Sequence, residues 1–298
     1  MTQPTLFPDD LRRPIVPFKT QLLKWVGNKQ RFAHEIISYF PREFSSYYEP
    51  FLGSGAVLAS LSPRTGFGSD VFAPLVEIWQ TLRADPDRLV NWYAERWGRI
   101  GKQPKEAVYE QVKATYNARP NGADLLFLCR SCYGGVVRFR KADGFMSTPC
   151  GVHDPIDTRS FARRVKEWSR RCASTEFIRS DYVAAMGRAE AGDLIYCDPP
   201  YLDSQAILYG AQSFGLGDLF EIIAGCKARG VFVALSIDGT KRSGNKICNV
   251  PIPDGLFAQE ALVNCGRSML RRFQMAGKTL EGEVVADRLL LTYSLSDG

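Results

Sequence analysis

The chain has 298 residues, of which 45% are hydrophobic and 23% charged, and its formal net charge is +6. This composition is typical of a globular protein and excludes a disordered or fibrous chain. No apolar run reaches the roughly 18 residues of a membrane span, and no basic segment with an apolar stretch behind it opens the chain. We therefore expect a cytoplasmic protein without a secretory signal and without membrane association.

The first part of the chain predicts a βαβ unit. Residues 1–18 are rich in proline and predict no regular element, and residues 31–39 predict a short helix that Pro41 ends. Residues 47–58 predict a strand, a glycine turn and a helix, and residues 65–69 predict a second strand that ends on Asp70. An acid about 20 residues after the turn completes the layout of a Rossmann-type nucleotide-binding unit.

The middle of the chain predicts helices instead of parallel strands. The helices are expected at 75–82, 86–97, 105–116 and 159–170. The run from Cys132 to Lys141 predicts a hairpin, because it has two glycines between aromatic and basic residues. This block is therefore expected to be an insert in the α/β domain.

The insert also carries the positive charge. Residues 81–170 contain 17 Lys and Arg against 10 Asp and Glu, a local net charge of +7 that leaves −1 for the rest of the chain. Such a segment favours a polyanionic partner, because each phosphate contact releases condensed counterions. A solvated basic face is the alternative that charge alone leaves open.

The cysteines do not predict a metal site. Of the eight cysteines, only Cys129 and Cys132 form a CxxC pair, and the chain has just two histidines. A structural zinc site needs about four nitrogen or sulfur ligands. We expect free thiols that pack as small hydrophobic side chains, in a reducing compartment.

The α/β pattern resumes near residue 175. Strands are predicted at 177–180, 193–197 and 231–237, a helix at 217–228, and two further strands at 257–264 and 288–294. The apolar run at 231–237 is typical of a buried parallel strand. We therefore predict an α/β fold in which residues 1–73 and 175–298 form a Rossmann-like sheet around a helical insert at 74–174.

The glycine turn and its acids indicate the kind of ligand. Gly53 and Gly55 allow a close backbone approach at a helix N-terminus, but Leu58 stands where a dehydrogenase fingerprint has a third glycine. Glu49 and Asp70 flank the turn, and two acids favour a ligand with hydroxyls and positive charge over a pyrophosphate. S-adenosylmethionine fits this description.

Asp198-Pro199-Pro200-Tyr201 follows a predicted apolar strand, so it should lie at the carboxyl edge of the sheet. The prolines remove backbone donors and leave the Asp198 carboxylate and the Pro199 carbonyl as acceptors. Two acceptors outside the ring plane would turn an exocyclic amine pyramidal and aim its lone pair at a methyl group. Tyr201 offers a stacking face worth roughly 1–3 kcal/mol. A structural Asp-Pro-Pro turn with a packed tyrosine is the alternative.

Three motifs together resemble those of the Dam-like, class-alpha DNA adenine-N6 methyltransferases. In order they are Lys24-Trp25-Val26-Gly27-Asn28-Lys29, the glycine motif at 48–57, and the motif at 198–201. The resemblance spans about residues 21–295. It implies a Rossmann-like S-adenosylmethionine-dependent methyltransferase sheet, with a target-recognition domain as the insert. The implied reaction transfers the methyl group to N6 of adenine in double-stranded DNA, without a metal.

The resemblance also implies roles for single residues. The catalytic residues would be Asp198, Pro199 and Tyr201. The cofactor would be bound by Trp25, Lys29, Phe51, Gly53, Gly55, Asp70, Asp181, Tyr182 and Asp198. DNA would be contacted by Lys24, Tyr133 and Arg138. We expect a monomer, with a cognate restriction endonuclease as a candidate partner.

The insert departs from the family pattern at the hairpin. The family often has Tyr-Asn-Gly there, with an Arg four residues beyond the Asn, whereas this chain has Tyr133-Gly134-Gly135 and then Arg138. The missing Asn amide removes one group that could contact a base or the backbone. A GATC target therefore does not follow from the resemblance.

Other interpretations stay open at this point. Trp25 could be a core residue, Asp70 a helix N-cap and Arg138 a solvated charge. The alternative functions are adenine methylation in RNA, cytosine-N4 methylation, a silent DNA-binding module and a nicotinamide oxidoreductase. Cytosine-N4 enzymes usually carry Ser where Asp198 stands, and the missing third glycine argues against the oxidoreductase.

Overall fold

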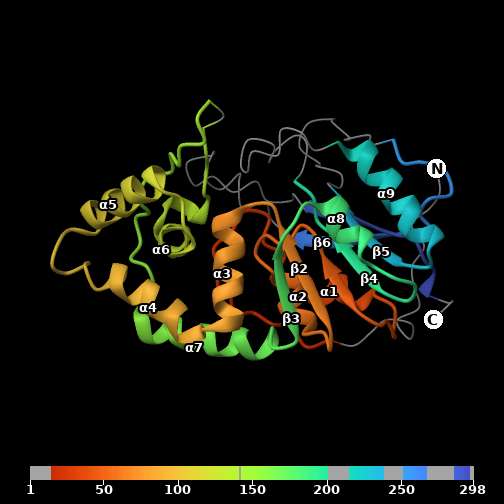
Figure 1. Ribbon diagram of the computed structural model, residues 1–298, viewed down its shortest axis with the longest axis horizontal. Helices are drawn as coiled ribbons and strands as arrows, with labels where there is room; N and C mark the ends of the chain where they lie inside the picture. The colour runs from red at the N-terminus through yellow and green to blue at the C-terminus, as the bar shows by residue number, and fades with distance from the viewer. Residues whose placement is uncertain (1–14, 141, 201–214, 238–250, 267–284, 296–298) are drawn as a thin grey trace.

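The computed structural model describes residues 15–140, 142–200, 215–237, 251–266 and 285–295 (Figure 1). In chain order its elements are α1 (Ala33–Ser38), β1 (Tyr47–Glu49), α2 (Ala56–Leu61), β2 (Gly66–Asp70), α3 (Ala73–Ala84), α4 (Pro86–Trp97), α5 (Lys105–Ala118), α6 (Gly122–Ser131), the 3₁₀ turn η2 (Tyr133–Gly135), α7 (Thr158–Arg171), β3 (Thr175–Arg179), α8 (Tyr182–Gly187), β4 (Leu194–Cys197), α9 (Leu216–Ala228), β5 (Phe232–Ile237), β6 (Gln259–Gly266) and β7 (Val285–Leu291).

The described strands form one sheet in the order β3-β2-β1-β4-β5-β7-β6. Strands β1 to β5 are parallel to their neighbours, whereas β7 runs antiparallel to β5 and to β6. The predicted Rossmann-like α/β fold is therefore confirmed. The strand order reverses between β1 and β4, and open α/β sheets bind their ligands in the crevice at such a reversal.

Helices bury both faces of this sheet. Tyr47 and Tyr196 pack with residues of α1, α2 and α3 on one face, while Tyr48 and Ile195 pack with residues of α8 and α9 on the other. Successive residues of a strand point to opposite faces, so a strand covered on both sides is apolar throughout. This explains the continuous apolar sequence of β4.

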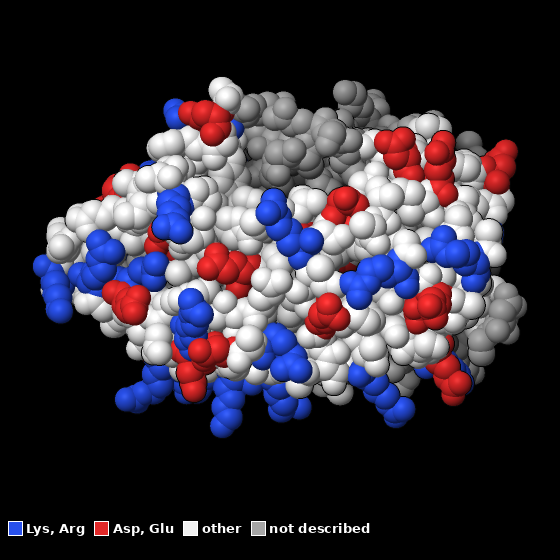
Figure 2. Space-filling model, viewed as in Figure 1, with Lys and Arg blue, Asp and Glu red and all other residues white. Residues whose placement is uncertain are grey.

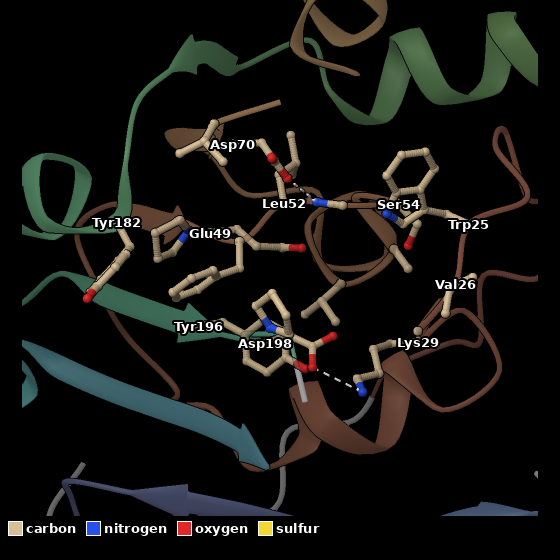
Figure 3. Close-up of a pocket in the computed structure, with 18 of the residues that line it drawn as sticks. Trp25, Val26, Lys29, Glu49, Leu52, Ser54, Asp70, Tyr182, Tyr196 and Asp198 are labelled. Carbon is tan, nitrogen blue, oxygen red and sulfur yellow. Dashed lines mark hydrogen bonds and ion pairs between the residues drawn. The ribbon is translucent and has the colours of Figure 1, made fainter. Parts of the chain in front are cut away.

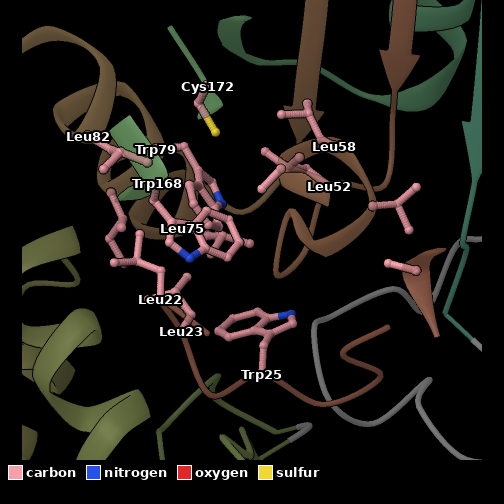
Figure 4. Close-up of a cluster of buried hydrophobic side chains, with 14 of the residues drawn as sticks. Leu22, Leu23, Trp25, Leu52, Leu58, Leu75, Trp79, Leu82, Trp168 and Cys172 are labelled. Carbon is pink, nitrogen blue, oxygen red and sulfur yellow. The ribbon is translucent and has the colours of Figure 1, made fainter. Parts of the chain in front are cut away.

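The insert lies beside the sheet and shares a core with it. Helix α3 packs against β2 and β3 as well as α4 and α6, and α7 packs against α4, α3 and α2. The rings of Trp79 in α3 and Trp168 in α7 stack with their centroids 5.4 Å apart (Figure 4). Helix α3, which the sequence assigned to the insert, therefore packs directly on the sheet, and α7 packs on α3 and α2.

The hairpin predicted over Cys132–Lys141 does not turn at its two glycines. Both glycines have positive φ, +65° and +67°, but they bend the chain within η2. The segments on either side of residue 141 run antiparallel, with bridges Cys132↔Cys150 and Phe139↔Met146, so the connection lies between Phe139 and Met146. We call residues 132–150 the insert hairpin.

Two of the described helices were not predicted, α6 and the short α8. All ten residues of α6 are buried, so it has no polar face that would give it a helical period. None of the described helices is long and apolar enough to cross a membrane.

Candidate active site

A pocket lies at the carboxyl ends of β1 and β4, where the strand order reverses, and it extends to the ends of β2 and β3 (Figure 3). The predicted cofactor and catalytic residues that line it are Trp25, Lys29, Phe51, Gly53, Asp70, Asp181, Tyr182 and Asp198. The fold thus brings together residues that are up to 173 positions apart. Gly55 and Pro199 do not line the pocket, and Tyr201 lies outside the described residues.

The glycine turn forms one wall. Gly53 and Gly55 have φ angles of +46° and +61°, a left-handed conformation that side chains disfavour. A Cβ atom on Gly53 would lie 3.4 Å from the Trp25 indole, and one on Gly55 would lie 3.4 Å from Trp79. Gly55 therefore serves the turn and its packing, while Gly53 leaves bare backbone facing the pocket.

Trp25 belongs both to the hydrophobic core and to the pocket wall. Its side chain is 7% exposed and packs in the same cluster as Leu23 and Leu52 (Figure 4). It also lines the pocket beside Gly53. The two interpretations of this residue are therefore compatible.

Asp70 ties the turn to the next strand. Gly53 N donates to Asp70 Oδ2 at 3.1 Å, and Phe72 N donates to Oδ1 at 3.0 Å. Burial raises the pKa of Asp70, although these hydrogen bonds oppose the shift. The N-cap position of α3 is Phe72, so Asp70 lies just before the helix and is not its cap.

Two aromatic rings that line the pocket stack on each other. The rings of Phe51 and Tyr182 stack with centroids 5.2 Å apart and an interplanar angle of 25°. Asp181 fixes the start of α8, because its side chain accepts a hydrogen bond from Ala184 N at 2.8 Å. This cap sets the position of Tyr182, the first residue of the helix.

Glu49 is a buried acid on the floor of the pocket. Its side chain is 3% exposed and accepts a 2.7 Å hydrogen bond from Tyr47 Oη. Burial raises the pKa of Glu49 to about 8, the hydrogen bond from Tyr47 opposes that rise, and the charge of Asp198 adds to it. At neutral pH the folded protein therefore holds Glu49 mostly in its protonated form.

Lys29 lies between two carboxylates. Its Nζ is 3.0 Å from Oδ1 of Asp198 and 3.0 Å from Oδ2 of Asp287. Burial alone would lower the pKa of Lys29, but the two carboxylates raise it well above its ordinary value. Sequence reasoning missed Asp287, since it lies 258 residues from Lys29 and no motif marks it.

The predicted DNA-contacting residues lie next to this pocket. Lys24 precedes Trp25, and a Cβ on Gly135 would be only 2.9 Å from the Lys24 Cβ, so the insert hairpin packs on this lysine. Tyr133 is 43% exposed, and Arg138 is exposed while its backbone N donates to Thr148 Oγ1 at 2.9 Å.

Ring contacts connect the hairpin with the pocket wall. Phe139 of the hairpin meets Phe72 edge to face at a centroid distance of 5.4 Å, and Phe72 lies 6.3 Å from Trp25. The hairpin is therefore fixed relative to the pocket by packed side chains.

Part of the positive charge of the insert lies elsewhere. Basic side chains project along the lower edge of the molecule, where α7 runs (Figures 1 and 2). The exposed basic residues of α7 are Arg159, Arg163, Lys166 and Arg170. Others are structural, since Arg130 and Arg164 donate to the carbonyls of Leu22 and Gln21 at 2.6 and 2.7 Å. The net charge of this segment therefore combines a solvated face with internal contacts.

The CxxC cysteines behave as packed thiols. Cys129 and Cys132 are buried and free, and burial raises the pKa of Cys132 to about 12. Among the residues that the structure describes, no three His, Cys, Asp or Glu side chains gather as a metal site would need. A metal-free reaction stays a prediction.

Comparisons with known proteins agree with this site. Residues 25–241 match the family described as D12 class N6 adenine-specific DNA methyltransferase. The chain is 27% identical to the DNA adenine methylase of Vibrio cholerae over 228 residues, which cover 72% of this chain and 79% of the relative. It is 22% identical to a type II methyltransferase of Lactococcus lactis, with the same coverage of 72% and 79%.

A relative from Escherichia phage P1 is much longer. This DNA N-6-adenine-methyltransferase is 27% identical over 197 residues, which cover 63% of this chain but only 25% of the relative. The chain thus spans about a quarter of that protein's length.

Proposed function

The chain belongs to the family of D12 class N6 adenine-specific DNA methyltransferases, and from this premise we propose how its residues serve the reaction. Its methyl donor, as the family implies, is S-adenosylmethionine, which supplies a methyl group on a positively charged sulfur. We propose that the acceptor is N6 of an adenine in double-stranded DNA and that Asp198 and Pro199 hold this amine.

The position of Asp198 carries the proposal. Its carboxylate lies in the same pocket as the glycine turn, at the end of β4, and Pro199 follows it directly. The carboxylate and the Pro199 carbonyl can only accept hydrogen bonds, which suits an amine that offers two donors. As the N–C bond formed, the S–C bond would break, S-adenosylhomocysteine would leave and N6 would pass one proton to water, so acceptors that favour a pyramidal nitrogen would lower the barrier.

The pocket fits S-adenosylmethionine by its own chemistry. The stacked rings of Phe51 and Tyr182 offer a surface for the adenine, and Asp70 lies at the strand end where a ribose can be bound. The bare backbone of Gly53 leaves room for close approach. The carboxyl groups of Asp70, Asp181 and Asp198 in the lining suit the ammonium and sulfonium charges of the donor.

DNA would approach from the side of the insert hairpin. We assign Lys24, Tyr133 and Arg138 to DNA contact, and the packing of Gly135 on Lys24 supports one continuous surface. The target adenine must leave the base stack, which costs a few kcal/mol. Tyr201, whose place the structure does not describe, is proposed as its stacking partner. The residues 74–174 would then be the target-recognition domain.

Methyl transfer from labelled S-adenosylmethionine tests the proposal. The protein is incubated with duplex DNA, single-stranded DNA or RNA, and the methylated nucleoside is identified by mass spectrometry. We expect N6-methyladenine, with duplex DNA as the preferred substrate. Methylation of RNA alone would favour the alternative of an RNA adenine methyltransferase. Formation of N4-methylcytosine would contradict N6 of adenine as the acceptor. The absence of any product would favour a silent DNA-binding module.

Asp198→Ala, with Glu221→Gln as a control for an exposed acid on α9, tests the catalytic assignment. We expect Asp198→Ala to lose at least a hundredfold in turnover while its unfolding transition stays close to that of the wild type. Glu221→Gln should keep full activity. Turnover above one-hundredth of wild type in a folded Asp198→Ala protein would refute the role of this carboxylate.

The compartment, the oligomeric state and the partner of the enzyme are also proposals. Because its substrate is DNA, we propose that it acts in the cytoplasm as a monomer. One relative bears the name of a type II methyltransferase, which supports a cognate restriction endonuclease as a partner. Sequencing the methylated DNA of a host that expresses the protein would give its target, and cleavage of unmethylated DNA at that target by an enzyme of the same source would identify the endonuclease.

A further inference from the structure

Asp287 is a buried acid that no motif of the sequence marks. It lies on β7, where it pairs with Val263 of β6, and only 6% of its surface is exposed. Side chains alternate along a strand, so Asp287 points to the same face as Leu289 and Leu291, the face that α1 and α2 cover. Lys29 lies four positions before Ala33, the first residue of α1, and meets Asp287 on this face.

The contact between these residues is direct. Lys29 Nζ donates to Asp287 Oδ2 at 3.0 Å, and the same ammonium lies 3.0 Å from Asp198 Oδ1. The ammonium also lies 5.8 Å from the ring centroid of Phe32. One cation is thus held between the carboxylate at the end of β4 and a carboxylate on β7.

Charge explains why a second carboxylate is useful here. A buried ammonium is unfavourable unless opposite charges compensate it, and a single buried ion pair would direct all of that compensation to Asp198. Among the described residues, Asp198, Asp287 and the phenol of Tyr196 face Lys29, and each of them raises the pKa of Lys29 against the effect of burial. Asp287 therefore shares the lysine charge with Asp198.

We propose that Asp287 is a positioning residue for methyl transfer, which holds the Lys29 ammonium against Oδ1 of Asp198 and so fixes the orientation of that carboxylate. The proposal rests on the function proposed above, in which Asp198 accepts hydrogen bonds from the target amine. Without Asp287, the Lys29 ammonium would lose its contact with β7 and could follow Asp198 into other rotamers. Misplacement of a reacting group by about 1 Å can reduce a rate by about a hundredfold.

Asp287→Asn tests this role, because the amide keeps the shape of the side chain and an acceptor oxygen but removes the charge. Asp287→Ala removes both. We expect kcat on duplex DNA to fall at least tenfold in Asp287→Asn and further in Asp287→Ala, with KM for S-adenosylmethionine changed less than threefold. Glu260→Gln is the matched control, since it breaks the surface ion pair of Glu260 with Arg288 across β6 and β7. It should keep the wild-type kcat.

The pH profile separates positioning from folding. With one carboxylate removed, Lys29 should lose its proton at lower pH, so the alkaline limb of kcat in Asp287→Asn should move to lower pH. A merely structural role would lower the active fraction, measured by titration of active sites, and leave kcat per active site and its pH profile unchanged. Either that result or wild-type kinetics would overturn the inference. A wild-type protein that transfers no methyl group would overturn the proposed function itself, and the inference with it.

Discussion

The buried carboxyl of Glu49 makes a quantitative prediction about stability. The folded protein raises the pKa of Glu49 from 4.5 to about 8, because the side chain is buried and lies near Asp198. In the unfolded chain the group ionises near its ordinary pKa. Between these values the folded state binds the extra proton, so the free energy of unfolding falls as pH rises, by about 1.4 kcal/mol per pH unit. Close to pH 8 this decrease levels off, so Glu49 lowers the free energy of unfolding by about 2 kcal/mol in total between pH 6 and pH 8.

Glu49→Gln should remove this pH dependence. Glutamine is nearly isosteric, stays neutral at every pH and can still accept the hydrogen bond of Tyr47 Oη. We therefore expect the variant to gain about 2 kcal/mol relative to wild type between pH 6 and pH 8. Urea unfolding followed by circular dichroism at several pH values measures the free energy of unfolding of both proteins. The other titrating groups contribute equally to the variant and the wild type, so they cancel in the difference.

The matched control is Glu176→Gln, because Glu176 is exposed on β3, which lies at one end of the sheet. Its difference from wild type should stay flat across the same range. A flat difference for Glu49→Gln as well would mean that Glu49 is ionised in the folded protein, and the argument from burial would then be wrong.

Three further predictions concern ligands. Phe51→Ala should weaken S-adenosylmethionine binding about 5- to 150-fold, since one stacked base is worth roughly 1–3 kcal/mol, and calorimetry that finds unchanged affinity would contradict the stacking surface. Gly135→Ala should weaken DNA binding more than cofactor binding, because a Cβ there would lie 2.9 Å from the Lys24 side chain at a φ of +67°; equal losses measured by fluorescence anisotropy and calorimetry would point to general misfolding. Arg138→Ala should relax specificity at one base pair, by about 1–3 kcal/mol, if the arginine reads a guanine. Methylation of all single-base variants of the target measures this, and a uniform drop with unchanged ranking would make Arg138 a phosphate contact.

Local signals in the sequence were enough to predict most of the sheet and one side of the site. Gly53 and Gly55 have positive φ angles, which favour glycine. A turn that needs this conformation can therefore be recognised from its glycines in the sequence. The apolar run of β4 reports burial on both faces, and the prolines behind it mark where the strand ends. Because parallel strands have their carboxyl ends at one edge, Asp70, Asp181 and Asp198 could be predicted to lie near each other without knowledge of the tertiary structure.

Other features were decided only by the tertiary structure. The insert hairpin turns between Phe139 and Met146 because these two residues form a bridge, as do Cys132 and Cys150, and the two glycines at 134–135 do not reveal this pairing. Helix α6 has no sequence period, since surrounding elements bury it on all sides.

The contact of Lys29 with Asp287 depends on the antiparallel register of β7 against β5 and β6. A slip of one residue in that register would turn Asp287 to the opposite face of the sheet. The pKa of Glu49 likewise depends on burial, which the chain acquires only when β1 is covered on both faces. A residue's type and its neighbours in sequence determine local conformation, whereas the charge state and partners of a buried group are determined by segments that meet only in the folded protein.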